Sequence, residues 1–115
     1  MTAATYNITC EQGSTFIQTL TITDNATPPV VRDLSAHSGR MQVRPDIESS
    51  TKLLDLTSGG GDMTLNSSGV IVVTVTATAT AALSQGGVYD LEIEAAGVVE
   101  RVIEGDFNLS KEVTR

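Results

Sequence analysis

The sequence has few of the residues on which catalytic and disulfide-stapled proteins depend. Its 115 residues include no Trp, one Cys, one His, three Pro, two Phe and two Tyr. A single Cys excludes an internal disulfide, so the chain is not a disulfide-stapled scaffold. Because aromatic residues make up only 3% of the chain, it offers no platform on which sugars or single-stranded nucleic acid could stack. The core must be built from Val, Ile, Leu, Met and Ala.

Basic residues and long apolar runs are also scarce. Seven Lys and Arg face fourteen Asp and Glu, which gives a formal net charge of -7. A surface of this sign repels phosphate, so we expect neither nucleic acid nor a membrane as a partner. No apolar run reaches the ~18 residues of a membrane span, and the N-terminus lacks the features of a signal peptide. We expect a single domain over residues 1–115, made in the cytoplasm.

Thr, Val and Ile are abundant, and these β-branched residues fit a pleated sheet better than a helix. The clearest alternation runs over 88–95, where Tyr89, Leu91 and Ile93 alternate with acidic residues. Turn residues separate the other candidate strands, which cover residues 5–9, 15–23, 30–34, 39–44, 50–57, 62–66, 69–77 and 98–110. The pattern predicts an all-β fold, an antiparallel immunoglobulin-like β-sandwich of about eight short strands.

Four other features of the sequence carry finer predictions. Apolar residues on both faces of 69–77 predict a central strand that is covered on both sides. The Ala-rich stretch 78–87 predicts one short helical crossover, which the double glycine at its end should terminate. Three consecutive glycines at 59–61 predict a hairpin between neighbouring strands, and Gly105 predicts a bulge or bend in the last strand.

The candidate reactive residues are isolated from the partners that chemistry requires. His37 has Asp33 nearby but cannot form a triad or a zinc site without distant partners. Cys10 has no evident base beside it and is expected to be a partly buried small apolar residue. The sequence therefore favours a protein that is not an enzyme and that holds no cofactor or metal.

Carboxylates are concentrated on two strands near the C-terminus. They are Asp90, Glu92 and Glu94 on one strand and Glu100, Glu104 and Asp106 on the returning strand. Paired carboxylates can bind Ca²⁺ or transfer protons, but this spacing matches no calcium-binding loop. The pattern is typical of a solvated sheet face, on which Arg40 and Arg101 are candidate partners for the carboxylates. A calcium- or sugar-binding module is the alternative from a different class.

Several short motifs resemble one class of virion protein. They are "EQGSTF" near the start, "GRMQVRP", "LLDLT", "GVYDLEI" and the closing "RVIEGDFNLSKEVTR". Together they resemble small structural proteins of tailed bacteriophages, of the immunoglobulin-like class related to the N-terminal domain of baseplate upper proteins. The similarity covers the chain from about Thr5 to Arg115.

This resemblance implies a non-enzymatic virion protein that acts through contacts with other virion proteins. One expectation is an adaptor on the tail or baseplate side that connects the tail to fibres and assembles as a homo-oligomer. The alternative is a capsid decoration, or cement, protein that bridges capsomers on the phage head. In both cases the protein is made in the host cytoplasm and resides in the virion.

Both ends of the chain are candidate contact arms. Val113, Thr114 and Arg115 follow the last predicted strand, where a short extension can add to a neighbour's sheet edge or dock in its groove. Thr5 and Tyr6 are the candidates near the N-terminus. For each end, a solvated terminus without a partner is the alternative.

Overall fold

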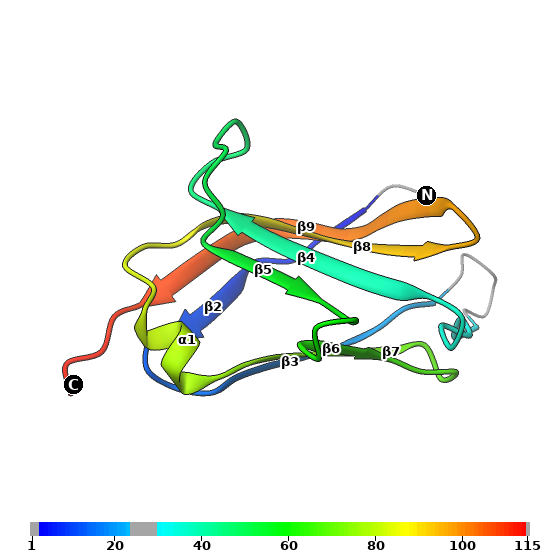
Figure 1. The fold of residues 1–115 in the computed structure, drawn as a ribbon, viewed down its shortest axis with the longest axis horizontal. Coiled ribbons are helices and arrows are strands. Elements are labelled where there is room, and N and C mark those ends of the chain that lie inside the picture. Colours follow the sequence, from blue (N-terminus) through cyan, green and yellow to red (C-terminus); the bar gives the residue numbers. More distant parts are fainter. Residues whose placement is uncertain (1–2, 24–29, 115) are drawn as a thin grey trace.

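Two β-sheets make up most of the computed structural model, which describes residues 3–23 and 30–114 (Figure 1). The larger sheet contains β1 (Ala4–Thr5), β2 (Ile8–Glu11), β4 (Ser38–Arg44), β5 (Leu54–Thr57), β8 (Gly87–Ala95) and β9 (Val98–Ser110). The smaller sheet contains β3 (Phe16–Thr21), β6 (Met63–Leu65) and β7 (Val70–Val75), and the short helix α1 (Ala77–Ala81) connects β7 to β8. The prediction of a mainly β fold with one short helix is confirmed.

The larger sheet is mixed, whereas the smaller sheet is antiparallel. The larger sheet has the order β9-β8-β4-β5, and both β1 and β2 pair with the outer side of β9. These two pairings are parallel, with Ile8 opposite Phe107, whereas all other pairings are antiparallel. The prediction of a wholly antiparallel structure is therefore wrong for the N-terminal strands, because β1 and β2 run in the same direction as β9.

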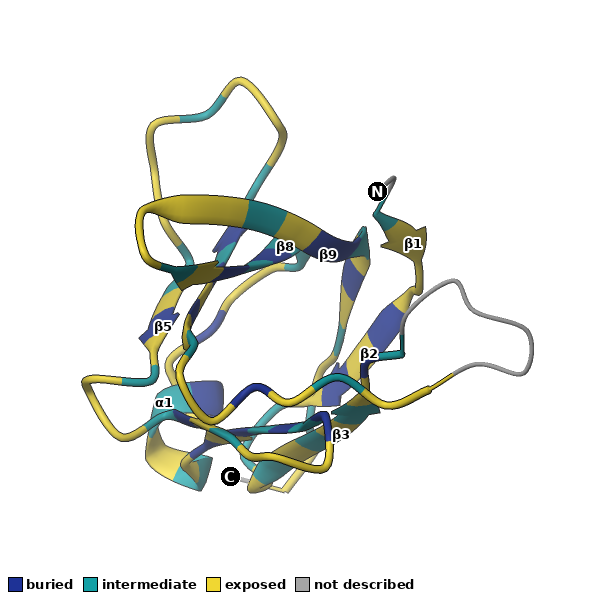
Figure 2. Cartoon of the chain, turned by 90° about the vertical axis from the view of Figure 1, so that its right-hand side faces the viewer, coloured by how far each residue is buried: buried dark blue, intermediate teal, exposed yellow. Residues whose placement is uncertain are grey.

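The core lies between the two sheets and is mostly aliphatic. Figure 2 shows buried residues on the faces that the sheets turn toward each other. Tyr89, Leu91 and Ile93 are all buried, so the alternation predicted for β8 is confirmed. The rings of Phe16 and Phe107 meet edge to face across the layers, with their centroids 6.1 Å apart. Aliphatic residues and three aromatic residues, Phe16, Tyr89 and Phe107, thus fill the core of this Trp-free chain.

The outer face of β7 is only partly covered. Ile71, Val73 and Val75 are buried, whereas Val70 and Val72 are half-buried on the other side of the strand. The strand is central within the smaller sheet, as expected. The prediction that both of its faces are covered is wrong, because in the described residues the second layer lies on one side only.

An irregularity in β9 lies three residues before the position that we predicted. Leu91 pairs with Ile103 and Glu92 with Arg101, so Val102 is the extra residue of the bulge. Both Val102 and Ile103 are buried, since the extra residue interrupts the alternation of side chains.

Gly105 instead permits a close approach of two backbones. It lies opposite Tyr89 on β8. A Cβ at Gly105 would lie 2.3 Å from the carbonyl oxygen of Tyr6, in the break between β1 and β2. The same oxygen accepts a hydrogen bond from the hydroxyl of Tyr89. The predicted strand 5–9 is therefore interrupted at Tyr6 and Asn7.

Three connections also differ from prediction. Segment 30–34, which we predicted to be a short edge strand, forms a single bridge between Thr23 and Val31. Leu34, at the end of this segment, is buried in the core, and its N–H donates to the Asn66 carbonyl. The glycines at 59–61 do not close a hairpin, since β5 and β6 belong to different sheets. The helix ends at Ala81, before the double glycine.

The buried hydroxyl of Thr80 explains the position of this helix. It donates to the carbonyl of Ser14 at 2.8 Å and accepts from the N–H of Gly13 at 3.0 Å. Leu83, which follows the helix, turns into the core. These contacts fix α1 against the turn between β2 and β3.

Candidate functional site

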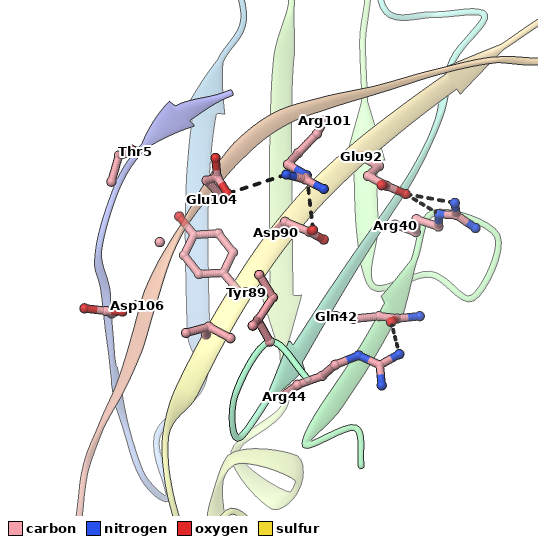
Figure 3. A pocket seen from close by; sticks show the side chains of 13 residues that line it. Thr5, Arg40, Gln42, Arg44, Tyr89, Asp90, Glu92, Arg101, Glu104 and Asp106 are labelled. Atoms are coloured by element: carbon pink, nitrogen blue, oxygen red, sulfur yellow. Dashed lines mark hydrogen bonds and ion pairs between the residues drawn. The ribbon is translucent and has the colours of Figure 1, made fainter. Parts of the chain in front are cut away.

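A groove of about 620 Å³ lies on the outer face of the larger sheet (Figure 3). Its lining comprises Thr5, Arg40, Gln42, Arg44, Ile47, Val88, Tyr89, Asp90, Glu92, Arg101, Glu104, Gly105 and Asp106. The alternation of β4, β8 and β9 turns the polar side chains of these strands away from the core, whereas Tyr89 is buried. The loop between β4 and β5 carries Ile47, a residue that is 83% exposed.

Ion pairs connect the three central strands of the groove. Arg40 Nε on β4 donates to Glu92 Oε1 on β8 at 2.8 Å. Arg101 Nε on β9 lies 3.3 Å from Asp90 Oδ2, and its Nη1 lies 3.7 Å from Glu104 Oε2. The prediction that Arg40 and Arg101 pair with the carboxylates of this face is confirmed.

Arg44 holds the loop between β4 and β5 against the sheet. Its Nη1 donates to the carbonyl of Ser49 at 2.8 Å, and its Nη2 donates to Gln42 Oε1 at 2.9 Å. No local residue pattern indicated this contact, because it depends on how the loop folds back against the sheet.

Two titratable groups that line the groove have raised pKa values. Burial raises the pKa of Asp90, and the neighbouring Glu92 raises it further, while Arg101 acts in the opposite direction. Burial and the proximity of Tyr6 raise the pKa of Tyr89 to about 12, and its hydroxyl is occupied by the Tyr6 carbonyl. In residues 3–23 and 30–114, no group of three or more His, Cys, Asp and Glu is placed to hold a metal ion. The groove is a surface of paired charges.

We expected Glu100 on this surface with the other carboxylates, but it lies on the opposite face of the sheet. It lies opposite the buried Ile93, and directly opposed residues share a face of the sheet. Its two carboxylate oxygens accept hydrogen bonds from Arg32, each at 2.9 Å. Those bonds hold the pKa of Glu100 below its usual value. The pair connects β9 to the segment after residue 30.

His37 and Cys10 occupy structural positions. His37 follows a turn and its N–H donates to the Leu34 carbonyl, while its Nδ1 is buried without a hydrogen bond in the described structure. The side chain of Asp33 bonds the N–H and hydroxyl of Ser35, and these bonds lower its pKa. Cys10 is fully buried on β2, where burial and then Glu11 raise the pKa of its thiol.

The predicted contact residues lie in two separate places. Thr5 and Tyr6 border β9, where Thr5 pairs with Glu104 and lines the groove. Val113 and Thr114 follow the end of β9 and are exposed, Val113 to 94%. Arg115 lies outside the described residues. In Figure 1, the blue strand β1 and the C-terminal end of β9 lie toward opposite ends of the molecule, so the two candidate arms do not form one site.

No protein-family model and no curated protein matches this chain. The described part of the chain includes no helix with the length and hydrophobicity needed to span a bilayer.

Proposed function

We propose that this protein is a non-enzymatic structural component of a tailed-phage virion, an adaptor that connects the tail or baseplate to fibres. The observation that carries the proposal is the position of the motifs that resemble this class. "GRMQVRP", "LLDLT", "GVYDLEI" and the beginning of "RVIEGDFNLSKEVTR" fall on β4, β5, β8 and β9. These four strands are adjacent in one sheet, in the order β9-β8-β4-β5. Motifs scattered along the sequence therefore belong to one structural unit.

The strand order supports an immunoglobulin-like assignment within this proposal. In that fold, three strands in the order B-E-D face a sheet that contains G-F-C, to which the variable type adds C′. Here β3-β7-β6 corresponds to B-E-D, and β9-β8-β4-β5 corresponds to G-F-C-C′. The N-terminal strands β1 and β2 pair with the outer side of β9, the strand that corresponds to G.

The outer surfaces suit contacts with other proteins. The groove carries charges of both signs close together, and such a pattern favours one orientation of a docking partner. Beside it, Ile47 presents an exposed apolar side chain on the loop between β4 and β5. Val113, Thr114, Thr5 and Tyr6 remain predicted contacts. The partners in this proposal are other virion proteins, and the chain itself is present as a homo-oligomer.

Gold labelling of purified virions tests the proposed location. An antibody against this chain should label the tail end of intact particles in electron micrographs. The matched control is the same labelling on particles from a phage in which the gene is deleted. Label over the head lattice would contradict the adaptor proposal and support the cement alternative. The absence of label from intact and disrupted particles would contradict both proposals.

A further inference from the structure

One edge of the smaller sheet presents unpaired backbone groups. β3 is at that edge, with β7 as its neighbour. The N–H of Ile22 donates to the Gly69 carbonyl on the β7 side, and backbone groups of alternate residues in a strand point the same way. The backbone groups of Ile17, Thr19 and Thr21 therefore point away from β7. Within residues 3–23 and 30–114, no strand pairs with this side.

β3 lacks the devices with which proteins protect such an edge. Charged residues, proline, bulges and short strands normally prevent pairing with another chain. The stretch from Ser14 to Thr23 contains no charged residue and no proline. By contrast, β6 has three residues, and β5 has four, with Asp55 bound to Lys52. The other edge of the larger sheet is interrupted at residues 6–7.

The strands of the smaller sheet carry no charged side chain on the outer face that adjoins this edge. The side chains on the outer face of the smaller sheet are those of Ile17, Thr19, Thr21, Thr64, Val70, Val72 and Thr74. Ile17 is 62% exposed. Two copies of a molecule with a net charge of -7 repel each other, and the carboxylates of the groove lie on the opposite sheet. A second copy can therefore approach the β3 edge, beside this uncharged face, at the lowest electrostatic cost.

We propose that β3 pairs antiparallel with β3 of a second copy of this chain across a two-fold axis. Thr19 lies opposite Thr19 of the second copy, and Ile17 lies opposite its Thr21. Each of these residues then exchanges N–H and C=O hydrogen bonds with the residue opposite it, and the Thr side chains meet as cross-strand pairs. The weak 3.4 Å bond from Gln18 Nε2 to the Thr19 carbonyl is exchanged for a backbone bond.

The two smaller sheets then form one continuous sheet with an uncharged face. A two-fold contact uses the same surface on both copies, so the assembly closes as a dimer and does not grow into a filament. This inference goes beyond the proposed virion role and does not depend on it.

Sedimentation equilibrium of the purified protein tests the dimer. We expect wild type to dimerise with a dissociation constant on the order of micromolar. Thr19→Lys places two like charges opposite each other and should weaken the dimer by about tenfold or more. Thr64→Lys adds the same charge on the same face, but on β6, away from the two-fold axis. That control should dimerise like wild type.

Amide exchange in wild type gives a second readout that needs no variant. The N–H groups of Ile17, Thr19 and Thr21 should exchange more slowly at concentrations where the dimer dominates than after dilution. A wild-type monomer at concentrations up to about 1 mM would overturn the inference. So would equal dimerisation of the Thr19→Lys variant, equal weakening by both lysine variants, or exchange at these amides that does not change on dilution.

Discussion

At the scale of single residues, Tyr89 makes the contact that positions the start of the chain. The residue is 4% exposed, and its hydroxyl donates a hydrogen bond to the carbonyl of Tyr6, which lies between β1 and β2. Tyr6 in turn donates its N–H to the Glu104 carbonyl at 2.8 Å. These bonds connect the N-terminal strands to β8 and β9, which form the groove.

Tyr89→Phe should lower the free energy of unfolding by about 1 kcal/mol, because it removes one buried hydrogen bond and leaves the ring in place. Urea unfolding at neutral pH measures the change. A variant as stable as wild type would show that this hydrogen bond adds nothing to the fold.

The same residue predicts a dependence of stability on pH. Burial, with a further contribution from Tyr6, raises the pKa of Tyr89 from 10.0 to about 12 in the folded state. The unfolded chain therefore loses this proton first as the pH rises, which favours unfolding. The contribution is fully present below pH 10 and is lost between pH 10 and about 12. Unfolding free energies measured across this window should fall more steeply for wild type than for Tyr89→Phe, and parallel curves would contradict the assignment.

Gly105 is the counterpart of Tyr89 on β9. A Cβ at this position would meet the Tyr6 backbone at 2.3 Å, so Gly105→Ala should destabilise the protein by about 1–3 kcal/mol. Gly59→Ala is the matched control, since a Cβ there has no atom within 4 Å, and it should change stability by less than about 0.5 kcal/mol. Chemical denaturation of both variants measures the difference. Equal effects would show that the backbones of Gly105 and Tyr6 can move apart without loss of stability.

At the scale of elements, the hairpin between β8 and β9 carries a residue in an unfavourable conformation. Ala96 has φ 51° and Gly97 has φ 81°, as expected for a two-residue type I′ turn. A positive φ is costly for Ala because its Cβ approaches the backbone.

Ala96→Gly should therefore stabilise the protein by about 0.5–1 kcal/mol. Ala95→Gly, one residue earlier and within β8, should destabilise it, because glycine weakens a strand. Thermal and urea unfolding of the two variants should give opposite signs. A loss of stability in the Ala96→Gly variant would contradict the turn geometry.

Elements with a local pattern were predictable from the sequence, and those that depend on distant pairings were not. The alternation of Tyr89, Leu91 and Ile93 set the orientation of β8 correctly, and it placed the groove carboxylates on the outer face. The position of the bulge at Val102 depends on register with β8, so no local residue indicated it. The parallel pairing of β1 and β2 with β9 joins segments about a hundred residues apart. In each case the missing information was the identity of the neighbouring strand.

The residues that line the groove could be anticipated only in part. Thr5 was predicted from its position near the N-terminus, and it lines the groove. Arg44 and Ile47 belong to the same surface because the loop after β4 folds beside it. The open edge at Ile17 was not evident either, since a sequence does not show which strands lie at a sheet edge.

At the scale of the whole molecule, two outer faces differ in character. The larger sheet presents paired charges and the exposed Ile47, whereas the smaller sheet presents an uncharged face of Thr, Val and Ile. In the proposed adaptor, the β3 edge of the smaller sheet joins copies of the chain, and the charged groove remains for other virion proteins. A connector requires this separation, because one surface cannot serve both kinds of contact at once.

The most direct test of the virion role is the copy number of this chain in purified particles, relative to the major capsid protein. Quantitative mass spectrometry with isotope-labelled peptides of both proteins gives the ratio. The adaptor proposal predicts a few to a few tens of copies in each particle, on the scale of a symmetric tail assembly. A number that approaches that of the major capsid protein would contradict the adaptor and favour the cement alternative, and absence from intact virions would contradict any structural role in the particle.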